Sequence, residues 1–305
     1  MLQKLLLLSV GIAFILIDAA HAALDADAIG KVVGVKASAS PDGVVRVTFP
    51  RNEVNVTVDG IAMKPFAGLS AWAAFTPGDA GAMMMGDTVV FEDEVAPAMD
   101  AAFAAGLEVT ALHNHFLFDA PKVYFMHIGG DGKPEELAVA VKQVWDAIKA
   151  VRAATPLPAK AFPGSAPEVG VVNPEPLEAI MGTKAMTQDG MTKFTFGRDG
   201  RMHGTKIGAS MGLSTWAVFS GSDASAVVDG DVIMAAGEVQ TVLRALRKTG
   251  IYVVALHNHM IGEDPAFFFV HFWGKGPAAD LARALRSVLD AQTAVDQKSM
   301  KSHAK

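Results

Sequence analysis

An internal repeat constrains this chain more than any other feature. When the sequence is shifted by 144 residues against itself, ALHNH at 111–115 aligns with ALHNH at 255–259. The alignment continues without a gap from Gly68 to Gly132. A repeat of this length indicates two copies of one domain rather than an array of short units. Both copies are therefore expected to adopt the same fold.

The length of 305 residues also fits two domains, at roughly 150 residues each. Residues 154–174 are rich in proline, alanine and glycine and show little periodicity, which is typical of an exposed connection. We expect the first copy to span residues 23–153 and the second to span 175–294. Residues 295–305 are polar and are expected to form a disordered tail.

Each copy alternates β-branched and apolar runs with breaks at Gly, Pro and Asp. In the first copy these runs predict strands at 43–50, 70–77 and 87–92. Apolar residues at helical spacing predict helices at 93–105 and 134–151. Strands joined by short turns, with few helices, predict an α+β fold in which helices cover a mainly antiparallel sheet. We expect a pseudo-twofold axis to relate the two copies.

The first 22 residues have the parts of a secretory signal peptide: Lys4, an apolar run at 5–17, and Ala-His-Ala at 20–22. We expect cleavage near Ala22 and a periplasmic or secreted protein. The apolar run is shorter than the ~20 residues of a spanning helix, so no stable membrane anchor is expected. The net charge of −6 gives no basic surface for nucleic acid, and the absence of cysteine excludes thiolate metal ligands.

Three histidines lie in a predicted β-hairpin at residues 111–130. His113 and His115 are two residues apart, so they are expected to project from one face of a strand. His127 joins that face if the turn centres on residues 119–121, whereas a slip of one residue sends it to the opposite face. The second copy repeats the pattern with His257, His259 and His271.

One carboxylate precedes each hairpin at a constant spacing. Glu94 and Glu238 each lie 19 residues before the first histidine of their copy. Three imidazoles and a carboxylate are a ligand set typical of a divalent transition metal such as Zn, Cu, Mn or Fe. The sequence thus predicts one metal site per copy, which in an enzyme would activate a bound water for attack on a small molecule. The predicted ligands are His113, His115, His127 and Glu94, and His257, His259, His271 and Glu238.

Two other interpretations of these residues stay open. The histidines can instead hydrogen-bond buried carbonyls or each other, and a carboxylate in the first turn of a helix is favoured by the helix dipole alone. For Glu94 and Glu238 this capping role is the favoured interpretation. The protein as a whole can then be a metal-free module that binds a cell-envelope glycan or a partner protein, with histidines that are structural or sensitive to pH.

Several blocks of the sequence are similar to a known family. MGDTVVFEDEV (85–95), TALHNH (110–115) and VYFMHIGG (123–130) resemble the LppY/LpqO lipoprotein family, whose shared domain is of unknown function. The resemblance runs through both copies and implies an exported bacterial protein built from a duplicated domain. The chain has no lipobox cysteine, so a soluble exported form is implied in place of a lipid anchor. Gly129 and Trp273 stand where the family often carries a further histidine.

Overall fold

The computed structural model describes residues 23–167 and 169–303. The expected signal peptide, residues 1–22, lies outside the described residues. Residues 295–303, expected as a disordered tail, are helical and form the end of α6 (Ala278–His303). No glycine or proline occurs between Ala278 and His303, so nothing in the sequence ends the helix earlier. No helix in the described part of the chain is long and apolar enough to cross a membrane.

The first half is an antiparallel sheet covered by helices, as the sequence predicts. Its main strands are β1 (Ser38–Ala39), β2 (Val45–Pro50), β5 (Ser70–Gly78), β6 (Gly81–Phe91), β7 (Glu108–His113) and β9 (Val123–Gly132). Its helices are α1 (Ala26–Val33), α2 (Val95–Ala104) and α3 (Pro134–Ala154). A small separate sheet contains β3 (Thr57–Val58), β4 (Ile61–Ala62) and β8 (Asp119–Ala120).

The second half repeats this order of elements. Its main strands are β10 (Met186–Gln188), β11 (Met191–Gly197), β14 (Ser214–Gly221), β15 (Ala226–Ala235), β16 (Tyr252–His257) and β18 (Phe267–Gly276). Helices α4 (Pro174–Met181) and α5 (Val239–Lys248) join α6. Its small sheet contains β12 (Gly200–Met202), β13 (Thr205–Ile207) and β17 (Glu263–Asp264). Short 3₁₀ helices occur at Pro65–Ala67, Ala209–Met211 and Ala236–Glu238.

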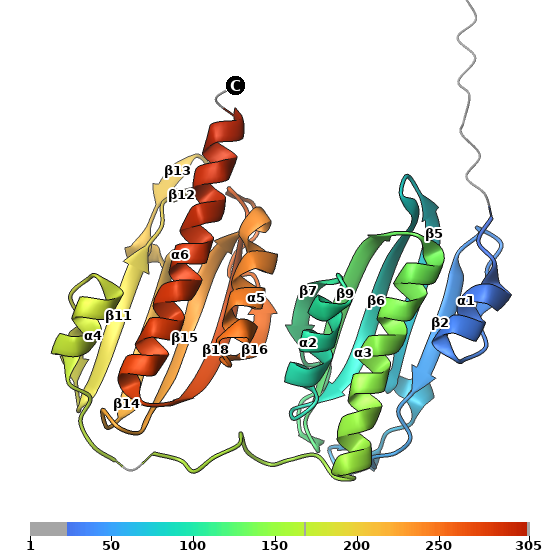
Figure 1. The fold of residues 1–305 in the computed structure, drawn as a ribbon, viewed down its shortest axis with the longest axis horizontal. Coiled ribbons are helices and arrows are strands. Elements are labelled where there is room, and N and C mark those ends of the chain that lie inside the picture. Colours follow the sequence, from blue (N-terminus) through green and yellow to red (C-terminus); the bar gives the residue numbers. More distant parts are fainter. Residues whose placement is uncertain (1–22, 168, 304–305) are drawn as a thin grey trace, which may run out of the picture.

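The main strands of both halves form one 12-stranded sheet, in the order β1-β2-β5-β6-β9-β7-β16-β18-β15-β14-β11-β10. The halves meet where β7 pairs antiparallel with β16, through Leu112 and Leu256. We call this junction the seam. Figure 1 shows the helices of both halves on the same face of the sheet. The other face of the sheet carries the histidines.

Local sequence explains where the covering helices start and stop. Pro134 occupies the first turn of α3, where its missing N–H has no intrahelical partner to lose. Leu137, Val141 and Val144 recur at helical spacing and are buried against the sheet. Gly106 follows α2 with φ 83°, a left-handed conformation that glycine adopts without steric cost. These positions fix the helices over the strands that carry the histidines.

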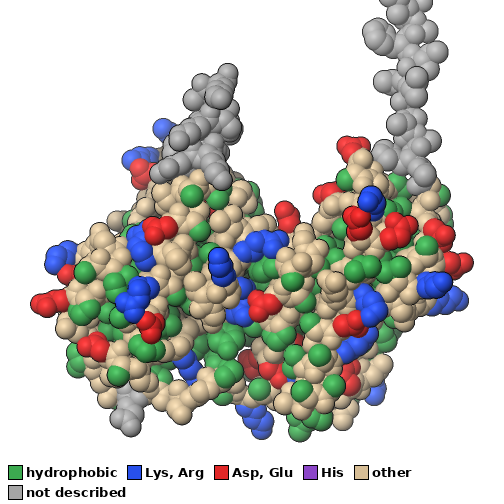
Figure 2. Space-filling view, viewed as in Figure 1, with side chains coloured by type: hydrophobic (Ala, Val, Ile, Leu, Met, Phe, Trp, Pro, Cys, Tyr) green, Lys and Arg blue, Asp and Glu red, His purple; other side chains and the backbone are tan. Residues whose placement is uncertain are grey.

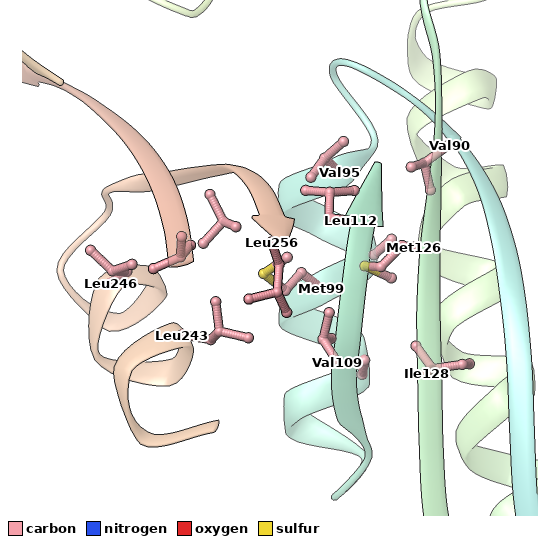
Figure 3. Close-up of a cluster of buried hydrophobic side chains, with 14 of the residues drawn as sticks. Val90, Val95, Met99, Val109, Leu112, Met126, Ile128, Leu243, Leu246 and Leu256 are labelled. Carbon is pink, nitrogen blue, oxygen red and sulfur yellow. The ribbon is translucent and has the colours of Figure 1, made fainter. Parts of the chain in front are cut away.

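The hydrophobic core continues across the seam. Leu112 and Met99 of the first half are fully buried, as are Leu243 and Leu246 of the second. Figure 3 shows Leu256 and Leu243 facing Met99 between the two halves. Burial of such side chains contributes about 1.5–3 kcal/mol each, so the seam is held by apolar packing as well as by strand pairing.

Side chains of α5 add polar contacts across the seam. Gln240 both donates to and accepts from the backbone of Val109, at 2.8 and 3.1 Å. Arg244 donates to the carbonyls of Phe103 and Leu107, which lie at and just beyond the end of α2. Carbonyls at a helix C-terminus lack intrahelical partners, so the arginine of one half caps a helix of the other.

Candidate functional site

The register of the hairpin brings the histidines of the first half to one face. In the β7–β9 ladder Ala111 pairs with His127, and His113 pairs with Phe125. Residues directly opposite each other share a face, so His113 and His127 lie on the same side of the sheet. The alternate residue Leu112 is buried on the side of the helices. The predicted site depends on this arrangement, in which His113 and His127 lie on one face of the sheet.

His115 follows the end of β7 and reaches the same cluster from a loop. Its ring stacks on Phe125 with ring centres 3.2 Å apart and an interplanar angle of 6°. The ring centre of His113 lies 5.2 Å from that of His115 and 5.1 Å from that of His127. We call His113, His115 and His127 the first histidine cluster.

Hydrogen bonds determine the tautomers of two rings in this cluster. His113 Nδ1 lies 3.2 Å from the carbonyl oxygen of Asn114, and a carbonyl only accepts, so Nδ1 donates. In the neutral ring, His113 Nε2 is then an acceptor. His127 Nε2 lies 3.0 Å from it and must donate. The first cluster is therefore closed by a hydrogen bond between two imidazoles.

The carboxylate beside this cluster belongs to Asp87, on the neighbouring strand β6. Asp87 pairs directly with His127 in the β6–β9 ladder. Its Oδ1 lies 3.9 Å from His127 Nε2, and this oxygen is buried without a hydrogen-bond partner. A buried carboxylate oxygen without a donor is costly, because it has lost water and gained nothing in exchange.

The second half repeats the arrangement with one difference in hydrogen bonding. The ring centre of His257 lies 5.1 Å from that of His259 and 5.0 Å from that of His271. His257 Nδ1 donates to the carbonyl of Phe269 at 3.0 Å, and His271 Nδ1 donates to that of Gly230 at 3.2 Å. Both rings therefore keep an unprotonated Nε2 when neutral. We call these three residues the second histidine cluster.

Asp231 takes the place of Asp87 in the second half. It pairs with His271 in the β15–β18 ladder, and its Oδ2 lies 3.3 Å from His259 Nε2. Its Oδ1 is buried without a partner, like that of Asp87. Burial raises the pKa of Asp231, although the three nearby histidines act in the opposite direction.

Burial also favours the neutral form of the outer histidine in each cluster. It lowers the pKa of His115 and His259; the neighbouring aspartate raises that pKa and the other histidines lower it further. The neutral ring is the form that binds a metal ion.

The structure does not bring Glu94 or Glu238 to the histidines. Both oxygens of Glu94 are engaged by Arg51 at 2.8–3.0 Å, and Arg152 lies 2.8 Å from one of them. The Glu94 carboxylate also accepts from the backbone N–H of Phe91. It is fully buried, so its role is structural: at the start of α2 it forms ion pairs with two buried arginines.

Glu238 has an equivalent structural role in the second half. Its carboxylate accepts from Arg198 at 2.8 Å and from Gln292 at 2.8 Å. It also accepts from the backbone N–H of Ala235. The predicted ligand sets thus hold their histidines together, whereas both predicted glutamates lie in ion pairs with arginine.

Asp87 and Asp231 each follow a glycine, as turn residues often do, and neither is among the ligands predicted from the sequence. They lie instead within long strands, where each faces a histidine on the next strand. The sequence does contain a feature that marks both aspartates, because they keep the 144-residue spacing of the repeat. The preceding glycine argues against a position inside a strand, since Gly-Asp pairs are common in turns.

The side chains as they stand do not converge on a single point. Within residues 23–167 and 169–303, no group of three or more His, Asp or Glu side chains is placed to hold a metal ion. The ring centres of His113 and His127 lie 5.1 Å apart, and those of His257 and His271 lie 5.0 Å apart. The short β7–β16 pairing leaves both clusters near the seam, on the face opposite the helices.

Figure 2 views the molecule from the side of the helices. No histidine of the described residues is visible on this face. The view agrees with the ladders, which place Leu112 and Leu256 on the helix side and the adjacent His113 and His257 on the other.

Fold and site together define a duplicated α+β protein with a cluster of three histidines and one aspartate in each half. The chain belongs to the family described as "Domain of Unknown Function (DUF1259)", whose profile matches residues 27–147 and 175–291. The two matched ranges coincide with the two halves of the structure, which confirms the duplicated domain. No curated protein matches the chain.

Similar solved structures are shell proteins of bacterial microcompartments. They include the trimeric shell protein PduB, at 10% identity, with 84% of this chain and 89% of that chain covered and a TM-score of 0.23. A double-ringed trimeric shell protein from the RMM microcompartment has 12% identity, 82% and 95% coverage and a TM-score of 0.20. EtuB from Clostridium kluyveri has 9% identity, 87% and 92% coverage and a TM-score of 0.20. Likeness at this level carries no argument about fold or function.

Proposed function

We propose that each half of this protein binds one divalent transition metal ion, such as Zn, Cu, Mn or Fe. The histidines are those predicted from the sequence, and aspartate replaces glutamate as the carboxylate. The proposed ligands are His113, His115, His127 and Asp87 in the first half, and His257, His259, His271 and Asp231 in the second.

One observation carries this proposal: the same orphaned carboxylate oxygen lies beside three histidines in both halves. Oδ1 of Asp87 and of Asp231 are buried with no hydrogen-bond partner. A cation is the partner that such an oxygen lacks, and imidazole nitrogen with carboxylate oxygen is a common ligand set for Zn and Fe. A purely structural cluster would be expected to satisfy both oxygens.

The hydrogen bonds of the second cluster support the same conclusion. His257 and His271 each donate Nδ1–H to a backbone carbonyl. Metal-bound histidines commonly donate their second nitrogen in this way, which fixes the tautomer and leaves Nε2 as the ligand. When bound, such an ion supplies Lewis acidity and lowers the pKa of a water molecule. Metal-dependent chemistry on a small molecule is the activity that this set would support.

We further infer that a pseudo-twofold axis relates the halves and passes through the seam. Leu112 and Leu256 occupy equivalent positions of the repeat, and they pair with each other. The strand order of the sheet is likewise the same when counted outward from the seam in either direction. The two proposed metal sites then face the same side of the molecule as near neighbours.

The cellular location is part of this proposal. A signal peptide at residues 1–22 and the resemblance to the LppY/LpqO lipoproteins favour a periplasmic or secreted protein. Envelope compartments give access to extracellular metal ions and to envelope glycans. The proposed partners are accordingly a metal ion and a small molecule or glycan, with neither nucleic acid nor a stable membrane anchor.

The test is elemental analysis by mass spectrometry of untagged protein purified without chelators. We expect close to two metal ions per chain, and close to none in a variant with all six clustered histidines replaced by alanine. His203→Ala is the matched control, because His203 lies outside both clusters, and it should keep the full metal content. Metal-free protein after incubation with Zn, Mn, Fe(II) and Cu would refute the proposal and favour the metal-free binding module.

A further inference from the structure

A cavity of about 640 Å³ lies where the two halves and the connecting segment meet. None of the six clustered histidines lines it. Its walls come from α2, the first residues of β9 and β16, the end of β18, and the connecting segment at Phe162. The cavity is large enough for a ligand of several rings, and small-molecule sites commonly occur at such junctions.

Aromatic rings form much of the wall. Phe162 packs against Tyr252 with ring centres 4.7 Å apart. It also lies nearly parallel to Trp273, at 15° and 6.1 Å. Tyr124 contributes a fourth ring from the other half. Trp273 Nε1 is buried without an acceptor, a deficit that a ligand oxygen would remove.

Most charged side chains of the lining already have partners. Asp100 accepts two hydrogen bonds from Arg247, at 2.8 and 2.9 Å. Asp93 is paired with Arg152 and accepts from the backbone N–H of Ala159. These pairs neutralise each other and leave little net charge for a ligand to meet.

Glu92 is the carboxylate of the lining that makes no hydrogen bond or ion pair among the described residues, and it is exposed at the mouth of the cavity. Burial raises the pKa of Glu92, and the charge of Lys122, which is itself hydrogen-bonded to Asp119, lowers it. Lys160, the other unpaired charge, lies exposed on the connecting segment.

The lining does not follow the internal repeat. Tyr252 and Trp273 align with Glu108 and Gly129 in the first half. Phe162 belongs to the connecting segment and has no counterpart. A histidine cluster occurs in each half, whereas these aromatic side chains of the cavity are not repeated in the first half.

We propose that this cavity binds an arylalkylamine, an aromatic ring carrying an aliphatic ammonium group, with the ring against Phe162, Tyr252 and Trp273 and the ammonium group toward Glu92. Aromatic contacts of this kind are worth about 0.5–1.5 kcal/mol beyond the area they bury. Cations are further attracted to the faces of tyrosine and tryptophan rings. The proposal is independent of metal binding, since none of the proposed metal ligands lines the cavity.

The test uses tyramine as the probe and isothermal titration calorimetry on the full chain. We expect saturable binding with one site per chain. The anion 4-hydroxyphenylacetate, which has the same phenol ring, should bind at least about tenfold more weakly, because about 1.4 kcal/mol of charge preference suffices for that ratio. The variant in which all six clustered histidines are replaced by alanine should bind tyramine as tightly as the unchanged protein does.

Two variants locate the site without disturbing the core. Glu92→Gln should weaken tyramine about fivefold and leave the weak binding of the anion unchanged or improved. Phe162→Ala, on the connecting segment, should weaken tyramine by a similar factor. Glu136→Gln, an exposed acid on α3 outside the cavity, is the matched control and should bind normally. Absence of saturable tyramine binding, equal affinity for the two probes, or binding unaffected by both variants would overturn the proposal.

Discussion

The two histidine clusters have the same residues but different hydrogen bonds. In the first, His127 Nε2 and His113 Nε2 lie 3.0 Å apart and share a proton. In the second, His257 and His271 both direct Nδ1 to backbone carbonyls and keep Nε2 free. Asp231 is also more deeply buried than Asp87, at 1% exposed against 8%. The comparison shows that the same set of side chains can either hydrogen-bond to each other or keep two Nε2 atoms free, depending on the tautomers.

The effect that bears most directly on this comparison is a difference in metal affinity between the halves. His113→Ala with His127→Ala leaves only the second site, and His257→Ala with His271→Ala leaves only the first. Each double variant should retain one metal ion per chain. The second site should bind about two- to tenfold more tightly, because the first must give up a hydrogen bond worth about 0.5–1.5 kcal/mol and shift the proton of His127 from Nε2 to Nδ1.

Competition with a chromophoric chelator measures both affinities. Equal affinities would show that the difference in hydrogen bonding has no effect on binding.

The second expected effect concerns the buried glutamates. Glu94→Ala should lower the free energy of unfolding by about 3–5 kcal/mol, because it removes the buried carboxylate shared by Arg51 and Arg152 and leaves them only their pairs with Glu53 and Asp93. Glu238→Ala should cost less, since its partner Arg198 has a side chain that is 23% exposed and can be solvated. Urea unfolding measures both values, and Glu136→Ala on the surface should stay within about 0.5 kcal/mol of the unchanged protein.

If either glutamate were a metal ligand instead, its substitution would reduce metal content without this loss of stability. Elemental analysis of the folded variants, in buffer without urea, separates the two roles. A full complement of metal in Glu238→Ala would support the structural assignment.

The smallest expected effect is on the pH dependence of stability in the metal-free protein. Burial raises the pKa of Asp231, so the folded state holds this proton more tightly than the unfolded chain does. The charged form therefore costs stability at neutral pH, and the cost disappears as the pH falls below the raised pKa. Asp231→Asn should raise the melting temperature at pH 7, and the gain should shrink as the pH is lowered.

Asp87→Asn is the matched variant in the other half. Its carboxylate is more exposed, so the gain at pH 7 should be smaller. Thermal unfolding monitored by circular dichroism, in the presence of a chelator, gives both values. A gain for Asp231→Asn that grows toward acid pH would contradict the assignment.

Features that depend on local periodicity could be predicted from the sequence. The repeat itself predicted two halves, and apolar spacing predicted α2 and α3 within a few residues of their observed ends. Alternation along the hairpin placed His113 and His127 on one face, and the β7–β9 ladder has the register that this requires. These predictions succeed because the period of a strand or helix fixes the direction of a side chain.

Features that depend on pairing between distant strands could not be predicted. Asp87 reaches the histidines only because β6 pairs with β9, which brings together residues 40 positions apart in the chain. Glu94 turns to Arg51 and Arg152, whose proximity follows from the packing of α3 over the sheet. Constant spacing along the chain made Glu94 look like a ligand, but spacing in sequence carries no information on which carboxylate lies nearest in space.

The pairing at the seam has a consequence for the history of the chain. A strand that pairs antiparallel with its own counterpart, as Leu112 does with Leu256, is self-complementary, which is the property that builds a symmetric dimer. A polypeptide carrying a single copy of this domain would present the same edge and could assemble the same sheet from two identical chains. Fusion of two such subunits by the segment after α3 would then have freed each copy to diverge: Trp273 could replace a glycine on one side without being imposed on the other.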